Sequence, residues 1–204
     1  MGTAMGSGDA FGGGIREGKY TEQIYSMIRD GKYHDAIAVL SGKALEFPNS
    51  RAAASLLGFC YYHIGDFANA VLTYERLKNS CPDVDEYKLY FAQSLFKAGL
   101  YEPALKACEN VADSTELSGR VLSLQAAIKY ELDDLLDAKA LIEQCPPDEA
   151  DTLVNQACVM YKEATQAGAE PPMLEKARLK FQEAMNQAGF QAELAYAIGL
   201  CYYQ

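Results

Sequence analysis

The chain is poor in the side chains that most often carry chemistry. Its 204 residues include no tryptophan and only two histidines, His34 and His63. None of the six cysteines forms a Cys-x-x-Cys pair. A structural zinc site needs about four convergent ligands, so we expect no metal site. The cysteines lie among apolar neighbours, which predicts buried, reduced thiols of a cytosolic protein.

The sequence also lacks the motifs of common enzyme classes. No GxxxxGK[ST] phosphate loop is present, and the glycines at 12–14 lead to no switch from strand to helix. A nucleophile needs a base at a fixed site, and we expect His34 to be a solvated imidazole on the first turn of a helix. Asp133 and Asp134 fall in a turn, where acidic residues most simply cap a helix. We therefore expect no enzymatic activity, no catalytic residue and no cofactor.

Positive charge and long apolar runs are scarce as well. The chain has 28 acidic and 18 basic residues, and its net charge is −10. This balance opposes nucleic-acid binding, which needs a clustered positive face, and it disfavours docking onto anionic lipid. No apolar run approaches the roughly 18 residues that span a bilayer, and no signal segment begins the chain. We expect protein partners, with no nucleic acid and no membrane insertion.

What the sequence does contain is a repeat with a period of 34 residues. A fourth, weaker copy has an alanine in register and Asp133 in place of the glycine. Such a period, with small residues at fixed positions, is typical of tetratricopeptide (TPR) helical hairpins. It predicts an all-α TPR solenoid of antiparallel helix pairs, a right-handed superhelix of about five and a half repeats. The recurring positions are a glycine (Gly31, Gly65, Gly99), an aromatic ring (Tyr33, Phe67, Tyr101) and an alanine (Ala36, Ala70, Ala104).

Each recurring residue has a physical role in the hairpin. Gly65 is expected to end the first helix, because glycine adopts positive φ without steric cost. Gly58 and Ala70 are small because two helix backbones approach closely there, and a larger side chain would overpack the contact. Pro82 cannot lie inside a helix and is expected to stop the second one.

Counting in this frame divides the chain into a flexible Gly-rich tail, 1–16, and a single TPR array, 17–204. In the fifth repeat Ala157 and Ala177 are twenty residues apart rather than twelve, which predicts a long loop at 163–174 with about eight extra residues. The chain ends without the polar capping helix of natural solenoids, so we expect an array truncated at its C-terminal end. The predicted repeats are 17–50, 51–84, 85–118, 119–149 and 150–191, followed by a partial repeat at 192–204.

The candidate binding site is the concave groove that the first helices of TPR units line. One inward position per repeat holds an aromatic residue in five of six cases. Rings with apolar faces and phenolic tips suit an extended or proline-rich peptide. The position in question is occupied by Ile28, Tyr62, Phe96, Tyr130, Tyr161 and Tyr203, and neighbouring positions add Tyr25, Phe59 and His63.

An aromatic stripe at helical spacing also occurs in protein cores. A shift of one residue would turn the predicted groove into packing between helices, which is the role we expect for Tyr61 and Tyr202. Full burial of Tyr62, Phe96 and Tyr130 would exclude the groove.

Four strings of sequence go beyond the generic repeat: Tyr25–Tyr33, Ser55–Tyr62, Arg120–Tyr130 and Tyr161–Glu163. Together they resemble the amino-terminal repeats of the intraflagellar transport protein 70 family, also called tetratricopeptide repeat protein 30. The string at Arg120–Tyr130 is the most specific, because generic TPR units do not require it. The resemblance implies a non-catalytic subunit of intraflagellar transport complex B. It also implies a place in the cilium or flagellum and at the basal body, on the cytoplasmic side.

The same resemblance implies particular partners. Members of the family wrap an extended, proline-containing segment of a fellow core subunit, intraflagellar transport protein 52. They support cilium assembly and are linked to tubulin polyglutamylation, and the kinesin-2 motor is a further candidate partner. The repeat alone leaves an alternative open, namely a generic cytosolic TPR adaptor or co-chaperone that binds a short peptide.

Overall fold

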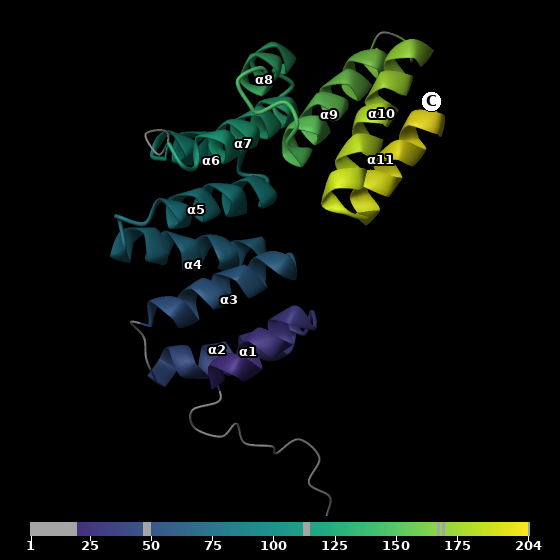
Figure 1. The fold of residues 1–204 in the computed structure, drawn as a ribbon. Coiled ribbons are helices and arrows are strands. Elements are labelled where there is room, and N and C mark those ends of the chain that lie inside the picture. The colour runs from purple at the N-terminus through teal and green to yellow at the C-terminus, as the bar shows by residue number, and fades with distance from the viewer. Residues whose placement is uncertain (1–19, 47–49, 112–114, 167, 169, 204) are drawn as a thin grey trace, which may run out of the picture. The chain divides into compact units, whose positions relative to one another are not determined.

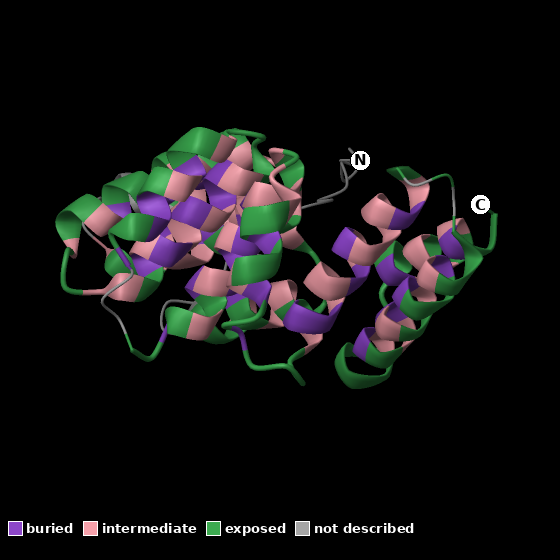
Figure 2. Ribbon diagram, turned by 90° about the horizontal axis from the view of Figure 1, so that it is seen from above, coloured by how far each residue is buried: buried purple, intermediate pink, exposed green. Residues whose placement is uncertain are grey.

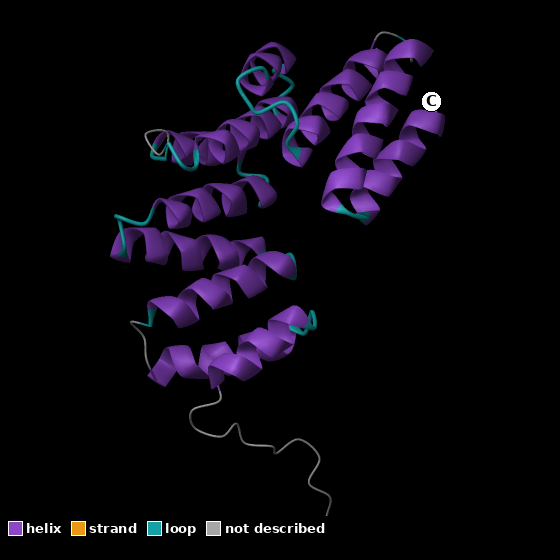
Figure 3. Cartoon of the chain, in the orientation of Figure 1, coloured by secondary structure: helices purple, strands orange, loops and turns teal. Residues whose placement is uncertain are grey.

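The computed structural model describes residues 20–46, 50–111, 115–166, 168 and 170–203, so the predicted tail at 1–16 lies outside the described residues. Within these ranges the chain forms eleven helices and no strand, which confirms the all-α prediction (Figures 1 and 3). No helix in the described residues has the length and apolar character to cross a membrane. In chain order the helices are α1 (Tyr20–Arg29), α2 (Tyr33–Glu46), α3 (Arg51–His63), α4 (Phe67–Ser80), α5 (Asp85–Lys97), α6 (Tyr101–Glu109), α7 (Ser118–Glu131), α8 (Leu135–Ile142), α9 (Ala150–Gln166), α10 (Pro171–Ala188) and α11 (Ala192–Tyr203).

Two compact units make up the chain, residues 1–65 and residues 66–204. The first contains α1 to α3, in which α1 packs against α2 and α2 against α3. The second contains α4 to α11, in which successive helices pack on one another and α7 also contacts α9. The single array over 17–204 stays a prediction.

The corners between paired helices follow the predicted glycine rule. Gly31, Gly65 and Gly99 have φ of +72°, +81° and +75°. At the fourth corner Asp133 has φ of +62°, the one positive φ among described residues other than glycine. Aspartate is one of the few side chains that tolerate this left-handed conformation. The backbone turn is therefore kept although the glycine is not.

The predicted small positions are buried where helices meet. The alanine that recurs in the second helix of each pair has no exposed surface in any repeat, which leaves no room for a larger side chain. Figure 2 shows buried and exposed positions alternating along the helices, as the amphipathic pattern requires. The five alanines are Ala36, Ala70, Ala104, Ala138 and Ala177.

Each unit has its own apolar core. In the first unit Ile24, Leu40 and Cys60 are buried together. The second unit has one cluster around Leu89 and Ile128 on α5 to α7, and further clusters along α7 to α11.

The predicted loop at 163–174 is wrong. Residues 163–166 complete α9 and residues 171–174 open α10, so only 167–170 lie between the two helices. With 17 and 18 residues, α9 and α10 are each four residues longer than α3 and α4, which have 13 and 14. The extra residues therefore lengthen both helices. Pro171 does not prevent this, because a proline is tolerated in the first turn, where its missing N–H has no intrahelical partner.

Candidate partner-binding surface

All nine predicted groove residues lie on the first helix of a pair. They belong to α1 and α3 in the first unit and to α5, α7, α9 and α11 in the second. Because the repeat places them at equivalent positions of each helix, their environments can be compared one by one.

In the first unit three rings from two helices meet at His63. The imidazole stacks on the Tyr33 ring, with 5.2 Å between ring centroids and 15° between planes. Phe59 lies one helical turn before His63, and their centroids are 4.1 Å apart. Tyr62 meets His63 edge-on at 5.8 Å. We call Tyr33, Phe59, Tyr62 and His63 the His63 ring cluster.

The His63 ring cluster favours uncharged side chains. Burial lowers the pKa of the His63 imidazole below its usual value and raises the pKa of the Tyr62 phenol. At neutral pH both side chains are therefore neutral, and the phenol keeps its proton as a hydrogen-bond donor. Phe59 remains 38% exposed, so part of the cluster is open to solvent.

On α5 the predicted groove residue Phe96 is half-buried. Its ring contacts the Tyr101 ring on α6 at a centroid distance of 5.9 Å, and Lys97 Nζ lies 5.9 Å from the Phe96 centroid. The Tyr101 hydroxyl donates to Glu131 Oε2 at 3.5 Å, which ties α6 to the end of α7.

On α7 the half-buried ring of Tyr130 is held by a lysine from α9. Lys162 Nζ stands 4.5 Å from the ring centroid, donates to the Tyr130 carbonyl oxygen at 3.0 Å, and pairs with Asp133 Oδ1 at 2.5 Å. We call these three residues the Lys162 anchor. Burial, followed by the nearby thiol of Cys158 and carboxyl of Glu131, raises the pKa of Tyr130 to about 12, so this phenol also stays protonated.

The remaining predicted residues differ in exposure. Tyr161 is half-buried against the apolar cluster of α9 to α11. Ile28 is also half-buried, whereas Tyr25 and Tyr203 are 57% and 87% exposed. None of the nine predicted groove residues is sealed inside the fold, and the full burial that would exclude the groove is not found for Tyr62, Phe96 and Tyr130.

The two tyrosines predicted to pack between helices behave differently. Tyr61 is half-buried against the core of the first unit, as predicted. The prediction for Tyr202 is wrong, because this side chain is 71% exposed. Its ring lies 5.3 Å from the guanidinium carbon of Arg178 rather than in the core.

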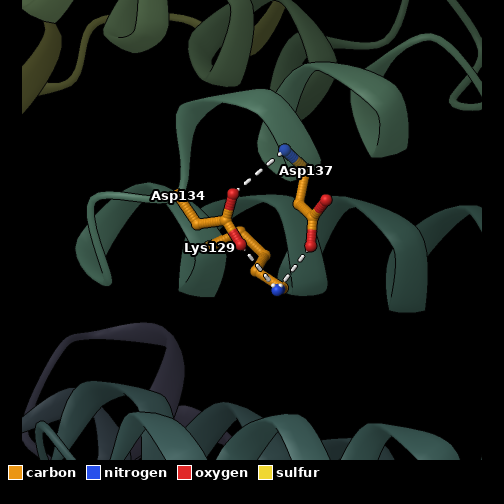
Figure 4. Close-up of polar contacts among 3 residues, drawn as sticks. All are labelled: Lys129, Asp134 and Asp137. Atoms are coloured by element: carbon orange, nitrogen blue, oxygen red, sulfur yellow. Dashed lines mark hydrogen bonds and ion pairs between the residues drawn. The ribbon is translucent and has the colours of Figure 1, made fainter.

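Sequence reasoning missed the cations at these rings and corners. Lys129 Nζ bridges Asp134 Oδ2 at 2.8 Å and Asp137 Oδ2 at 2.6 Å (Figure 4). The predicted cap is confirmed, since Asp134 Oδ1 accepts the backbone N–H of Asp137 at 3.2 Å. The lysine, followed by this backbone N–H, lowers the pKa of the Asp134 carboxyl. Adjacency in the sequence gave no signal for the Lys162 contact, because Lys162 follows Tyr161 in the chain but contacts Tyr130, 32 residues earlier.

The described residues contain no group of three or more His, Cys, Asp or Glu side chains that could hold a metal ion. The contacts around the predicted groove residues combine rings and phenol donors with lysines, of which Lys162 is paired with a carboxylate. Such a set can pack against apolar side chains and donate hydrogen bonds to backbone carbonyl groups of a peptide.

No family model matches the chain, but curated relatives do. It is 44% identical over 189 residues to intraflagellar transport protein 70A of Danio rerio, which covers 93% of this chain and 28% of the relative. It is 40% identical over 188 residues to the tetratricopeptide repeat protein 30 homologue of Caenorhabditis elegans, with 92% and 27% covered. Intraflagellar transport protein 70B of Homo sapiens is 38% identical over 202 residues, with 94% and 29% covered. The chain thus spans little more than a quarter of the length of these relatives.

Solved structures resemble the fold at low sequence identity. A thermophilic TPR protein of Thermus thermophilus matches with a TM-score of 0.69 and 14% identity, covering 91% of this chain and 98% of that one. A tetratricopeptide repeat protein from Parabacteroides merdae matches with a TM-score of 0.62 and 12% identity, covering 91% and 72%. These similarities confirm the TPR fold.

Proposed function

We propose that this chain, a homologue of the intraflagellar transport protein 70 and tetratricopeptide repeat protein 30 family along 93% of its length, is part of a non-catalytic protein–protein interaction scaffold in intraflagellar transport. The observation that carries the proposal is that accessible and half-buried rings recur at equivalent positions of the first helices within each unit. TPR folds host many functions, so the homology supplies the biological setting and the rings supply the binding surface.

The proposed ligand is an extended, proline-containing segment of another complex B core subunit, of the intraflagellar transport protein 52 type. Proline rings pack well on aromatic faces, and an extended peptide offers free backbone carbonyl groups. The phenols of Tyr62 and Tyr130 can donate to such carbonyl groups, because burial keeps both protonated at neutral pH. The neutral imidazole of His63 fits the same apolar ligand.

The names of the relatives support a setting in intraflagellar transport. The whole protein would act in the cilium or flagellum and at the basal body, on the cytoplasmic side, as a subunit of complex B. We propose that it supports cilium assembly and tubulin polyglutamylation through the partners it holds, with the kinesin-2 motor as a further partner, and that it performs no catalysis itself.

The test is a binding measurement on the full-length protein that carries Tyr62→Asp, Phe96→Asp and Tyr130→Asp together. The ligand is a labelled peptide from the proline-containing segment of the core subunit. We expect affinity to fall by tenfold or more, since buried negative charge and lost ring faces both oppose docking. The matched control is Leu136→Asp on α8, because Leu136 is 83% exposed on a second helix.

Circular dichroism shows whether the variants keep their helices. Because Tyr62, Phe96 and Tyr130 are half-buried, the single variant Phe59→Asp at a more exposed ring provides a milder version of the same test. Wild-type affinity in both helical variants would contradict the proposal. A generic adaptor for a short charged tail would instead lose binding as the salt concentration rises, which the apolar ligand proposed here does not.

A further inference from the structure

A second surface of the larger unit lies apart from the predicted groove residues. A cavity of about 370 Å³ opens among α4, α5 and α6, and none of the nine predicted groove residues lines it. This volume is near the lower end of the range of ligand pockets, which suits one or two side chains rather than a large cofactor. We call it the α4–α6 pocket.

The α4–α6 pocket is basic although the chain is acidic. Lys78, Lys88 and Lys106 line it, and no acidic residue is among the described residues that do so, whereas the whole chain has a net charge of −10. Lys88 is neutralised by Asp85, whose Oδ1 is 2.6 Å from Lys88 Nζ. Among described residues, no ion pair involves Lys78 or Lys106. Lys78 Nζ donates to the neutral amide oxygen of Asn79 at 3.3 Å. Two of the three positive charges therefore have no carboxylate partner among the described residues.

The remainder of the pocket wall is largely apolar. Phe91 and Leu95 of α5 and Pro103 of α6 contribute to it. Lys78 Nζ stands 4.6 Å from the Phe91 ring centroid, so a cation–π contact positions one ammonium group beside the apolar wall. The pocket thus combines available positive charge with an aromatic face.

We propose that the α4–α6 pocket binds an acidic peptide segment of a protein partner. A glutamate or aspartate carboxylate of that segment pairs with Lys78 and Lys106, and a neighbouring aliphatic or aromatic side chain packs on Phe91. Charge complementarity selects the acidic ligand, and the apolar wall selects a peptide over a small inorganic anion, which has nothing to place there. This site is distinct from the proposed groove, since none of the nine predicted groove residues lines it, although α5 carries both Phe96 and three lining residues of the pocket.

The test is fluorescence anisotropy of the full chain with a labelled peptide of alternating glutamate and leucine. The comparison peptide replaces each glutamate by glutamine. We expect the glutamate peptide to bind at least tenfold more tightly than the glutamine peptide, and its affinity to fall with rising salt concentration. The double variant Lys78→Glu, Lys106→Glu is expected to lose at least tenfold in affinity for the glutamate peptide.

Two control variants test whether binding depends on this pocket rather than on the net charge of the chain or on the proposed groove. Lys176→Glu paired with Arg51→Glu makes the same change in net charge at exposed basic residues that do not line the pocket, and we expect it to retain binding. Phe59→Asp, which tests the proposed groove, is also expected to retain it. Equal affinity for both peptides, equal loss in the control variant, or full competition by inorganic phosphate at matched ionic strength would overturn the proposal.

Discussion

The His63 ring cluster and the Lys162 anchor hold equivalent tyrosines in two different ways. In the first unit Tyr62 meets His63 edge-on, and the His63 ring in turn contacts the rings of Tyr33 and Phe59. In the second unit the Tyr130 ring lies beside an ammonium group that also binds a backbone carbonyl oxygen and a carboxylate. The tyrosine at one repeat position can therefore be held by ring packing or by a cation. The two arrangements should differ in how substitutions and pH change the free energy of unfolding.

The largest effect should come from removing the cation of the Lys162 anchor. Lys162→Met deletes a charged hydrogen bond and an ion pair, and it leaves the left-handed Asp133 without its partner. We expect the free energy of unfolding to fall by about 1 to 3 kcal/mol, measured by urea denaturation. Lys180→Met is the matched control: its ion pair with Glu183 is exposed on α10, and we expect a loss of about 0 to 1 kcal/mol. Equal losses of unfolding free energy in both variants would show that the contacts of Lys162 stabilise the fold no more than an exposed ion pair does.

A smaller effect, the pH dependence of the free energy of unfolding, should distinguish the His63 ring cluster from the Lys162 anchor. The folded state lowers the pKa of His63, so between the folded and unfolded pKa values the unfolded chain binds more protons. The contribution of His63 to the free energy of unfolding is therefore fully present above the ordinary imidazole pKa of about 6.5. It is lost as the pH falls through the lowered pKa of the folded state.

Urea denaturation between pH 7.5 and pH 5 measures this contribution. In His63→Gln the part of the acid-induced loss in stability that belongs to His63 should disappear. His34→Gln, on α2 and outside the His63 ring cluster, should leave that loss unchanged. The same acid-induced loss in His63→Gln and wild type would contradict the neutral ring stack.

The smallest effect should come from restoring glycine at the fourth corner. Asp133→Gly relieves the cost of a left-handed aspartate but removes its ion pair with Lys162, and the Asp133 side chain is 73% exposed. We expect these changes to offset each other to within about 0.5 kcal/mol in urea denaturation. Gly99→Asp places aspartate at the equivalent corner without the lysine and should destabilise the chain. A clear loss in Asp133→Gly would show that the ion pair, rather than the backbone, decides this corner.

The sequence predicted the features that depend on neighbouring residues and on the repeat. The corner glycines, the buried alanines and the cap at Asp134 are local requirements of helical hairpins, so a period of 34 residues reveals them. The prediction of a loop at 163–174 was wrong because the number of extra residues does not show whether they form a longer loop or extend the two flanking helices. Lys162 was missed because it meets Tyr130 from 32 residues away, on another helix.

The sequence by itself determined the all-α TPR fold, because small residues at a fixed period allow only close helical hairpins with left-handed corners. It also placed aromatic residues at one position of successive first helices. Only the tertiary structure decided how each ring is held, which lysines have no carboxylate partner among the described residues, and that the α4–α6 pocket exists. Those properties arise where side chains from separate helices meet, and no local pattern along the chain encodes such contacts.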